Sequence, residues 1–165
     1  MSSRFSLRDF QQGVLDRLKS QTSDANRVTT LGVVVGKEHW LVDMADISEA
    51  LPVPTLTHVP SAQPWFCGVA NVRGNLYSVT DLAAFFGHEV TERDSSARVL
   101  LLGQKYAFSA GLLVTRVLGL RNAKEWKQSG EGENVYLQDS SGQKWRRLDI
   151  VELLNRPEFL HIGVQ

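Results

Sequence analysis

Residues 68–82 have the sequence Gly-Val-Ala-Asn-Val-Arg-Gly-Asn-Leu-Tyr-Ser-Val-Thr-Asp-Leu and carry the clearest structural pattern in the chain. Two apolar runs, Val69–Val72 and Leu76–Thr80, flank Arg73-Gly74-Asn75, as is typical of a β-hairpin. Glycine at position 74 permits the positive φ that a tight turn requires. The pattern therefore predicts a hairpin that holds a cationic side chain, Arg73, at its tip.

A short helix is expected directly after this hairpin. Asp81 precedes the run Leu82–Phe86, which Gly87 ends, and aspartate is a preferred helix N-cap. Arg73 then has two possible roles. It forms a structural ion pair within the domain, with Asp81 as the obvious partner, or its guanidinium recognises a carboxylate or backbone oxygens of another protein. The residues leave both roles open.

Further apolar runs on both sides of this segment predict three more hairpins. Each pair flanks a turn that contains glycine: 31–35 with 39–42, 98–102 with 106–110, and 135–138 with 143–147. Short helices are expected at Met44–Ala50 and Asp149–Asn155, before Pro52 and Pro157. Short strands at regular spacing indicate an all-β fold with a few short helices, of the barrel or sandwich type.

The first 27 residues have a different pattern and predict an amphipathic helix followed by a polar linker. Phe10, Val14, Leu15 and Leu18 fall at helical spacing on one stripe, and residues 20–26 are polar. Such a helix is more often a flap packed on its own domain than an anchor. A helix that docks on a partner or a membrane surface is the alternative.

Length and composition place the chain among ordinary globular proteins. It has 165 residues, 42% of them hydrophobic, with 18 basic and 18 acidic side chains. Zero net charge argues against a general nucleic-acid binder, which needs surplus Lys and Arg. A single cysteine, Cys67, cannot form an internal disulfide, and no apolar run approaches the ~18–20 residues that span a bilayer. We therefore expect a cytoplasmic protein without direct membrane insertion.

The neutral total hides an uneven distribution of charge. Residues 38–94 carry two basic and eight acidic side chains, whereas residues 95–147 carry nine basic and four acidic ones. The distribution is either ordinary surface unevenness or a sign of two oppositely charged patches that face different partners.

No residue pattern in the chain indicates catalysis. The four histidines lie far apart, and no His-x-x-x-His or Cys-x-x-Cys spacing suits a metal. We expect no cofactor. Cys67 with a distant histidine is one enzymatic alternative, although its neighbours Trp65 and Phe66 favour a small buried residue. A second alternative is a nucleic-acid-binding barrel that uses the basic residues of 98–147.

The central motif resembles the signature of the CheW-like domain, the adaptor family of bacterial chemosensory arrays. The matching positions are Gly68, Val69, Asn71–Gly74, Val79, Asp81, Leu82 and Gly87. The resemblance covers about residues 28–155, which leaves a helix and linker at 1–27 and a C-terminal tail at 156–165. Ser78, where the family often has proline, and Thr115, where it often has an acidic residue, depart from the pattern. With the N-terminal helix, they resemble the branch associated with type IV pili and twitching motility.

The resemblance implies a fold, a function and a site. The fold would be two intertwined five-stranded SH3-like β-barrels with a groove between them. The function would be non-catalytic: a cytoplasmic adaptor, peripheral to inner-membrane receptor arrays, that couples the cytoplasmic tip of a methyl-accepting chemoreceptor to the CheW-like regulatory domain of a histidine kinase. Asn71, Val72, Arg73 and Gly74 would then lie where the family contacts partners.

Overall fold

The computed structural model describes residues 29–165, except 104, 107–108, 132–134, 162 and 164–165. The predicted N-terminal helix and linker lie outside the described residues. Within them, no helix is long and apolar enough to cross a membrane.

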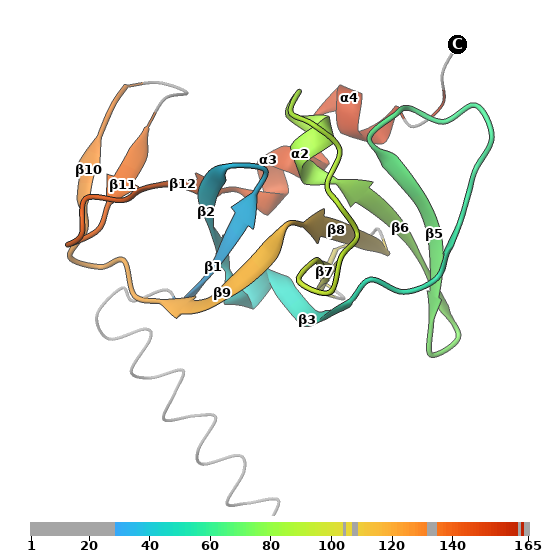
Figure 1. The fold of residues 1–165 in the computed structure, drawn as a ribbon, viewed down its shortest axis with the longest axis horizontal. Helices are drawn as coiled ribbons and strands as arrows, with labels where there is room; N and C mark the ends of the chain where they lie inside the picture. The colour runs from blue at the N-terminus through green and yellow to red at the C-terminus, as the bar shows by residue number, and fades with distance from the viewer. Residues whose placement is uncertain (1–28, 104, 107–108, 132–134, 162, 164–165) are drawn as a thin grey trace, which may run out of the picture.

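The described chain forms two six-stranded sheets and a few short helices (Figure 1). In strand order, sheet A contains β10 (Lys127–Ser129), β11 (Tyr136–Gln138), β12 (Lys144–Leu148), β2 (Glu38–Asp43), β1 (Thr30–Val35) and β9 (Arg116–Arg121). Sheet B contains β3 (Ile47–Pro52), β7 (Arg98–Leu102), β8 (Ala110–Val114), β6 (Asn75–Asp81), β5 (Phe66–Val72) and β4 (Leu56–Thr57). The helices are η1 (Met44–Asp46), α2 (Leu82–Phe85), α3 (Ile150–Leu154) and α4 (Pro157–Leu160).

The two sheets are intertwined along the chain, as expected. The chain enters sheet A with β1 and β2, builds all of sheet B, and returns to sheet A with β9 to β12. The two edge strands of sheet B, β3 and β4, are consecutive in sequence, and so are the edge strands β9 and β10 of sheet A. Residues 53–55 and 122–126 make these two connections, so each sheet must curl to bring its own edges together.

The all-β prediction is confirmed, but the strand count and the closure differ from two five-stranded barrels. In each sheet the extra strand is very short: β4 has two residues and β10 has three. Strands of two or three residues are too short to show an alternation of apolar and polar residues in the sequence. Within the described residues the edge strands of each sheet are not hydrogen-bonded to each other, so both sheets are curled and open.

Three of the four predicted hairpins are present, and the remaining one has its return strand displaced. β7 pairs with β8 in the register Arg98↔Val114, so the return strand is residues 110–114 and not 106–110. All five residues of β8 are buried because β8 lies between β7 and β6. Tyr106 instead lies in the connection, where its hydroxyl donates a hydrogen bond to Asp46.

The helix predicted at Met44–Ala50 is wrong. Only η1 is helical, with Asp43 accepting a hydrogen bond from the amide of Ala45 at 2.9 Å. From Ile47 the chain forms β3, in which half-buried and exposed residues alternate. β3 lies at the edge of sheet B, and an edge strand tolerates its terminal Pro52.

The main hydrophobic core lies between the sheets, and a second cluster fills the inside of sheet B. The first combines residues of β1, β2, β7, β8 and β12 with the helices, and the second includes Ala70, Val79, Val99 and Leu113. The predicted C-terminal tail contains α4, whose Phe159 is buried in the first core against Trp65 and Phe85.

Candidate functional site

The β5–β6 hairpin ends in a two-residue turn with an unusual backbone. Val72 pairs with Asn75, so Arg73 and Gly74 form the turn, with φ values of +52° and +88°. A type I′ hairpin turn requires positive φ at both positions, which glycine adopts easily and arginine rarely does. The side-chain oxygen of Asn71 accepts a hydrogen bond from the amide of Gly74 at 2.9 Å. The turn therefore holds the Arg73 backbone in a conformation that arginine itself does not favour.

Glu49 of β3 fixes the Arg73 side chain. Both guanidinium amino groups donate to the Glu49 carboxylate, one of them at 3.3 Å. The hydrogen bond from Arg73 lowers the pKa of Glu49, and the bond to Glu49 raises the pKa of Arg73. β3 and β5 lie on opposite sides of sheet B, so this contact depends on the curl of the sheet. Two-thirds of the Arg73 side chain (68%) still faces solvent.

Asp81, the expected partner of Arg73, has a different role. It lies at the other end of β6, is 1% exposed, and accepts hydrogen bonds from the amide and the hydroxyl of Thr91, both at 2.7 Å. It also caps α2 by accepting from the amide of Ala84 at 3.4 Å, as predicted. The seven residues of β6 place the two ends roughly 20 Å apart, too far for an Arg73–Asp81 pair.

Of the four residues predicted to form the site, three are exposed and one is packed inside the sheet. Asn71, Arg73 and Gly74 are exposed at the tip, whereas Val72 packs against the cluster inside sheet B. Leu76 is a further tip residue that was not predicted: it lies directly across from Asn71 and is 62% exposed. Strand alternation could have revealed it, because Tyr77 and Val79 occupy the inward positions. The tip thus combines an oriented guanidinium, an amide and an exposed apolar side chain.

Two departures from the family pattern also have structural roles. The amide of Ser78 donates to the carbonyl of Ser109 at 2.9 Å, a bond that proline cannot make. The hydroxyl of Thr115 accepts from the amide of Gly36 at 2.9 Å and so links the junction of β8 and β9 to the β1–β2 turn. Both residues join parts of the chain that are distant in sequence.

Cys67 has the properties of a packed residue. It contacts the cluster inside sheet B, and burial, with the nearby Asp81 charge, raises its pKa to about 11. At neutral pH the thiol is therefore protonated, which is the opposite of an activated nucleophile. No group of three or more His, Cys, Asp or Glu side chains in the described part of the chain is arranged to hold a metal ion.

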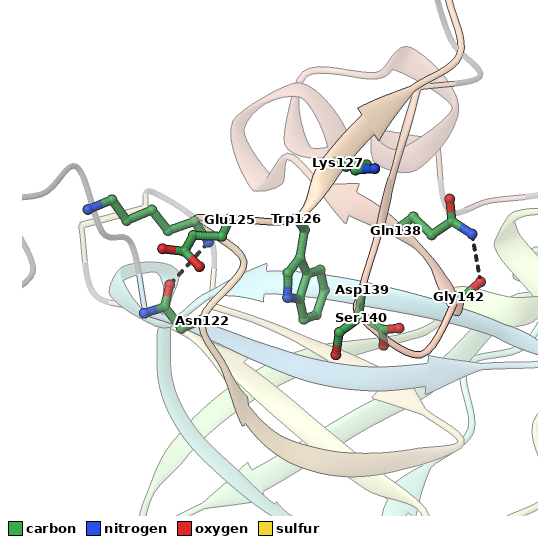
Figure 2. Close-up of a pocket in the computed structure, with 9 residues that line it drawn as sticks. Asn122, Glu125, Trp126, Lys127, Gln138, Asp139, Ser140 and Gly142 are labelled. Atoms are coloured by element: carbon green, nitrogen blue, oxygen red, sulfur yellow. Dashed lines mark hydrogen bonds between the residues drawn. The ribbon is translucent and has the colours of Figure 1, made fainter.

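A cavity of about 880 Å³ opens at one end of sheet A, between the β9–β10 connection and the β11–β12 turn (Figure 2). Trp126 lies between the two segments, 5.4 Å from the ring of buried Trp145. Asp139 accepts hydrogen bonds from the hydroxyl of Ser141 and from the indole of Trp145, and these bonds lower its pKa to about 2. Asp139 therefore holds the turn together.

A second cavity, of about 670 Å³, lies between β2 and β12 of sheet A, the segment after α2, and α3. Its wall contains Trp40, which stacks on Phe86 with ring centroids 5.0 Å apart. Glu38 bonds His88 at 2.9 Å and Arg146 at 3.3 Å, so these contacts tie sheet A to the segment after α2. The basic segment 98–147 does not form one unit, because β7 and β8 belong to sheet B and β9 to β12 to sheet A.

Comparison with known proteins identifies the family. The chain is 32% identical over 105 residues to Protein PilI of Pseudomonas aeruginosa, a match that covers 64% of this chain and 58% of that protein. It is 26% identical over 72 residues to Chemotaxis protein CheW of Helicobacter pylori, covering 44% of each chain. The chain thus spans less than two-thirds of both relatives.

A solved structure, the scaffolding protein TtCheW from Thermoanaerobacter tengcongensis, has the same fold. It superposes with a TM-score of 0.64 and 16% identity, over 74% of this chain and 89% of that one. The family model of the CheW-like domain matches residues 29–155, which is most of the chain. This protein therefore belongs to the CheW-like domain family.

Proposed function

We propose that the protein is a non-catalytic adaptor that couples the cytoplasmic tip of a chemoreceptor to the CheW-like regulatory domain of a histidine kinase. It acts in the cytoplasm at inner-membrane receptor arrays. The observation that carries the proposal is the hairpin tip of a CheW-like domain, where Arg73 is exposed and oriented by Glu49.

The geometry of the tip suits recognition of another protein. A guanidinium presents several donors in a fixed plane and matches carboxylates or backbone oxygens. Fixing Arg73 in advance reduces the side-chain entropy lost on binding. Leu76 adds an apolar surface beside the polar group, a combination common in protein interfaces. A contact limited to a hairpin tip would be small and supports reversible association.

We further propose that the adaptor serves a type IV pilus system that controls twitching motility. The similarity to Protein PilI supports this assignment over other chemosensory systems. The sequence features at Ser78, Thr115 and the N-terminal segment point the same way. The partners would then be the receptor and the kinase of the same system, with no nucleic acid involved.

Substitution of Arg73 tests the role of the tip. Isothermal titration would measure binding of the kinase regulatory domain and of a receptor-tip fragment to three forms of the full chain: wild type, Arg73→Glu, and Arg116→Glu as a control in sheet A. We expect Arg73→Glu to weaken at least one interaction about tenfold or more, while the control binds normally. Normal binding of both partners by Arg73→Glu would assign Arg73 a structural role.

The double variant Glu49→Arg/Arg73→Glu separates recognition from internal pairing. It keeps an ion pair between β3 and the hairpin but moves the positive charge away from the tip. If a partner reads the charge at the tip, the double variant binds as weakly as Arg73→Glu. If the ion pair matters only for structure, the double variant recovers wild-type binding.

A further inference from the structure

Two apolar side chains are left exposed beside the point where the described chain begins. The carbonyl of Thr29 accepts a hydrogen bond from the amide of Met44 at 3.0 Å. On the other side of β1, Leu120 of β9 pairs with Leu31. The Leu120 residue is 59% exposed and Met44 is 36% exposed. Met44 and Leu120, which we call the apolar patch, thus lie on either side of the start of β1.

The Leu120 side of this patch lies on the same face of sheet A as the main core. Leu31 is only 7% exposed and belongs to the cluster between the sheets. Residues directly opposite each other in an antiparallel pair project from the same face, so Leu120 lies on the core side of sheet A. Other described residues cover Leu31, but Leu120 is open to solvent. The apolar face of sheet A therefore continues at Leu120, beyond the part that is covered.

We propose that the chain's own residues 1–28 cover this patch, through the stripe of Phe10, Val14, Leu15 and Leu18. The segment joins β1 at Thr29, beside Met44. Ten residues separate Leu18 from Thr29 and span at most ~35 Å when extended, which is enough to fold back onto the patch. The helix predicted for this segment is too short to be stable alone in water, and burial of its apolar stripe on such a surface would stabilise it.

The connection by a short linker favours this occupant over a separate molecule. A tethered segment reaches an effective concentration in the millimolar range, which a free partner seldom matches in a cell. The assignment does not depend on the proposed adaptor function, since the patch is formed by β1, β9 and η1 and lies outside the β5–β6 hairpin.

Methyl NMR provides a direct test because the chain has two methionines, Met1 and Met44. Spectra of the full chain labelled at methionine methyls would be compared for wild type, Phe10→Ser/Leu15→Ser on the stripe, and Gln12→Ser/Asp16→Ser off the stripe. We expect the Met44 resonance to move in the stripe variant and to keep its position in the control. Leu120→Ser should move it in the same way as the stripe variant. An unchanged Met44 resonance in the stripe variant overturns the proposal.

Two further measurements complete the test. Trypsin cleavage after Arg17 and Lys19 should be about fivefold faster in the stripe variant than in the control, because cleavage follows the population of the undocked segment. Equal rates contradict docking. Spectra at roughly 20 and 400 μM should coincide, since intramolecular docking does not depend on concentration. A concentration-dependent Met44 shift assigns the patch to a second copy and overturns the proposal.

Discussion

Arg73 and Glu49 join the tip of the β5–β6 hairpin to β3 by a two-pronged ion pair across the curled end of sheet B. The pair is exposed, so it contributes little to the stability of the fold. Its main effect is to fix the direction of a guanidinium that the turn already holds at the surface. Conformational strain and a fixed charge thus coincide at one residue, as is common where a protein recognises a partner.

Replacing Arg73 with asparagine should separate stability from binding. Arg73 has a φ of +52°, which asparagine adopts more readily in a type I′ turn. We expect Arg73→Asn to raise the free energy of unfolding by about 0.5–1 kcal/mol in urea titrations and to weaken partner binding. A less stable variant would contradict the strain assigned to this turn.

The two motif glycines Gly68 and Gly87 should differ sharply in their tolerance of alanine. A Cβ at Gly68 would lie 2.4 Å from the carbonyl oxygen of Thr57, and its φ is +127°. At Gly87 the φ is +90°, but nothing lies within 4 Å of the added Cβ. We expect Gly68→Ala to cost more than about 3 kcal/mol of unfolding free energy and Gly87→Ala about 1 kcal/mol. Similar losses of unfolding free energy in the two variants would show that the carbonyl of Thr57 can move to make room for a Cβ at position 68.

The aspartates that cap α2 and α3 provide a matched pair that differs in burial. Asp81 is buried and accepts three hydrogen bonds, whereas exposed Asp149 caps α3 through the amide of Glu152 at 3.1 Å. Chemical denaturation should show a loss of about 2–3 kcal/mol for Asp81→Ala, which leaves the Thr91 donors without their acceptor. For Asp149→Ala we expect about 1 kcal/mol. If both substitutions lower the free energy of unfolding equally, the Asp81–Thr91 contact adds no stability beyond that of the helix cap.

Stability should depend on Asp139 between about pH 4 and pH 2. Its pKa is lowered from 3.8 to about 2 by the bonds from Ser141 and Trp145, so the unfolded chain takes up this proton first as the pH falls. The stabilisation is therefore complete above the unfolded pKa and is lost as the pH falls through the folded pKa. In urea titrations followed by tryptophan fluorescence, the difference between wild type and Asp139→Asn should be constant from pH 7 to about 5 and then shrink. A constant difference down to pH 2 would contradict the assignment.

The parts of the fold that depend on residues close together in the sequence could be predicted from it. The β5–β6 hairpin and the Asp81 cap follow from alternation, a glycine turn and one capping residue. The helix predicted at Met44–Ala50 failed because β3 is held by pairing with distant β7, which overrides a weak local pattern. The two-residue β4 exists only because β5 pairs with it.

The candidate site was predictable in position but not in its interactions. Arg73 was placed at the tip from the turn residues alone. Its partner Glu49 lies 24 positions earlier, and only the curl of sheet B brings the two together. Sequence order alone also does not assign the basic segment to one sheet, since β7 and β8 join sheet B and β9 to β12 join sheet A, and the two oppositely charged patches stay a prediction.

The adaptor role is tested most directly by whether the full chain bridges its two partners. Analytical ultracentrifugation would compare mixtures of a receptor-tip fragment and the kinase regulatory domain, with and without this protein. The account predicts that the two partners sediment together only when the protein is present, and that Arg73→Glu reduces this complex whereas Arg116→Glu does not. Binding of neither partner, or of one to the exclusion of the other, would contradict it.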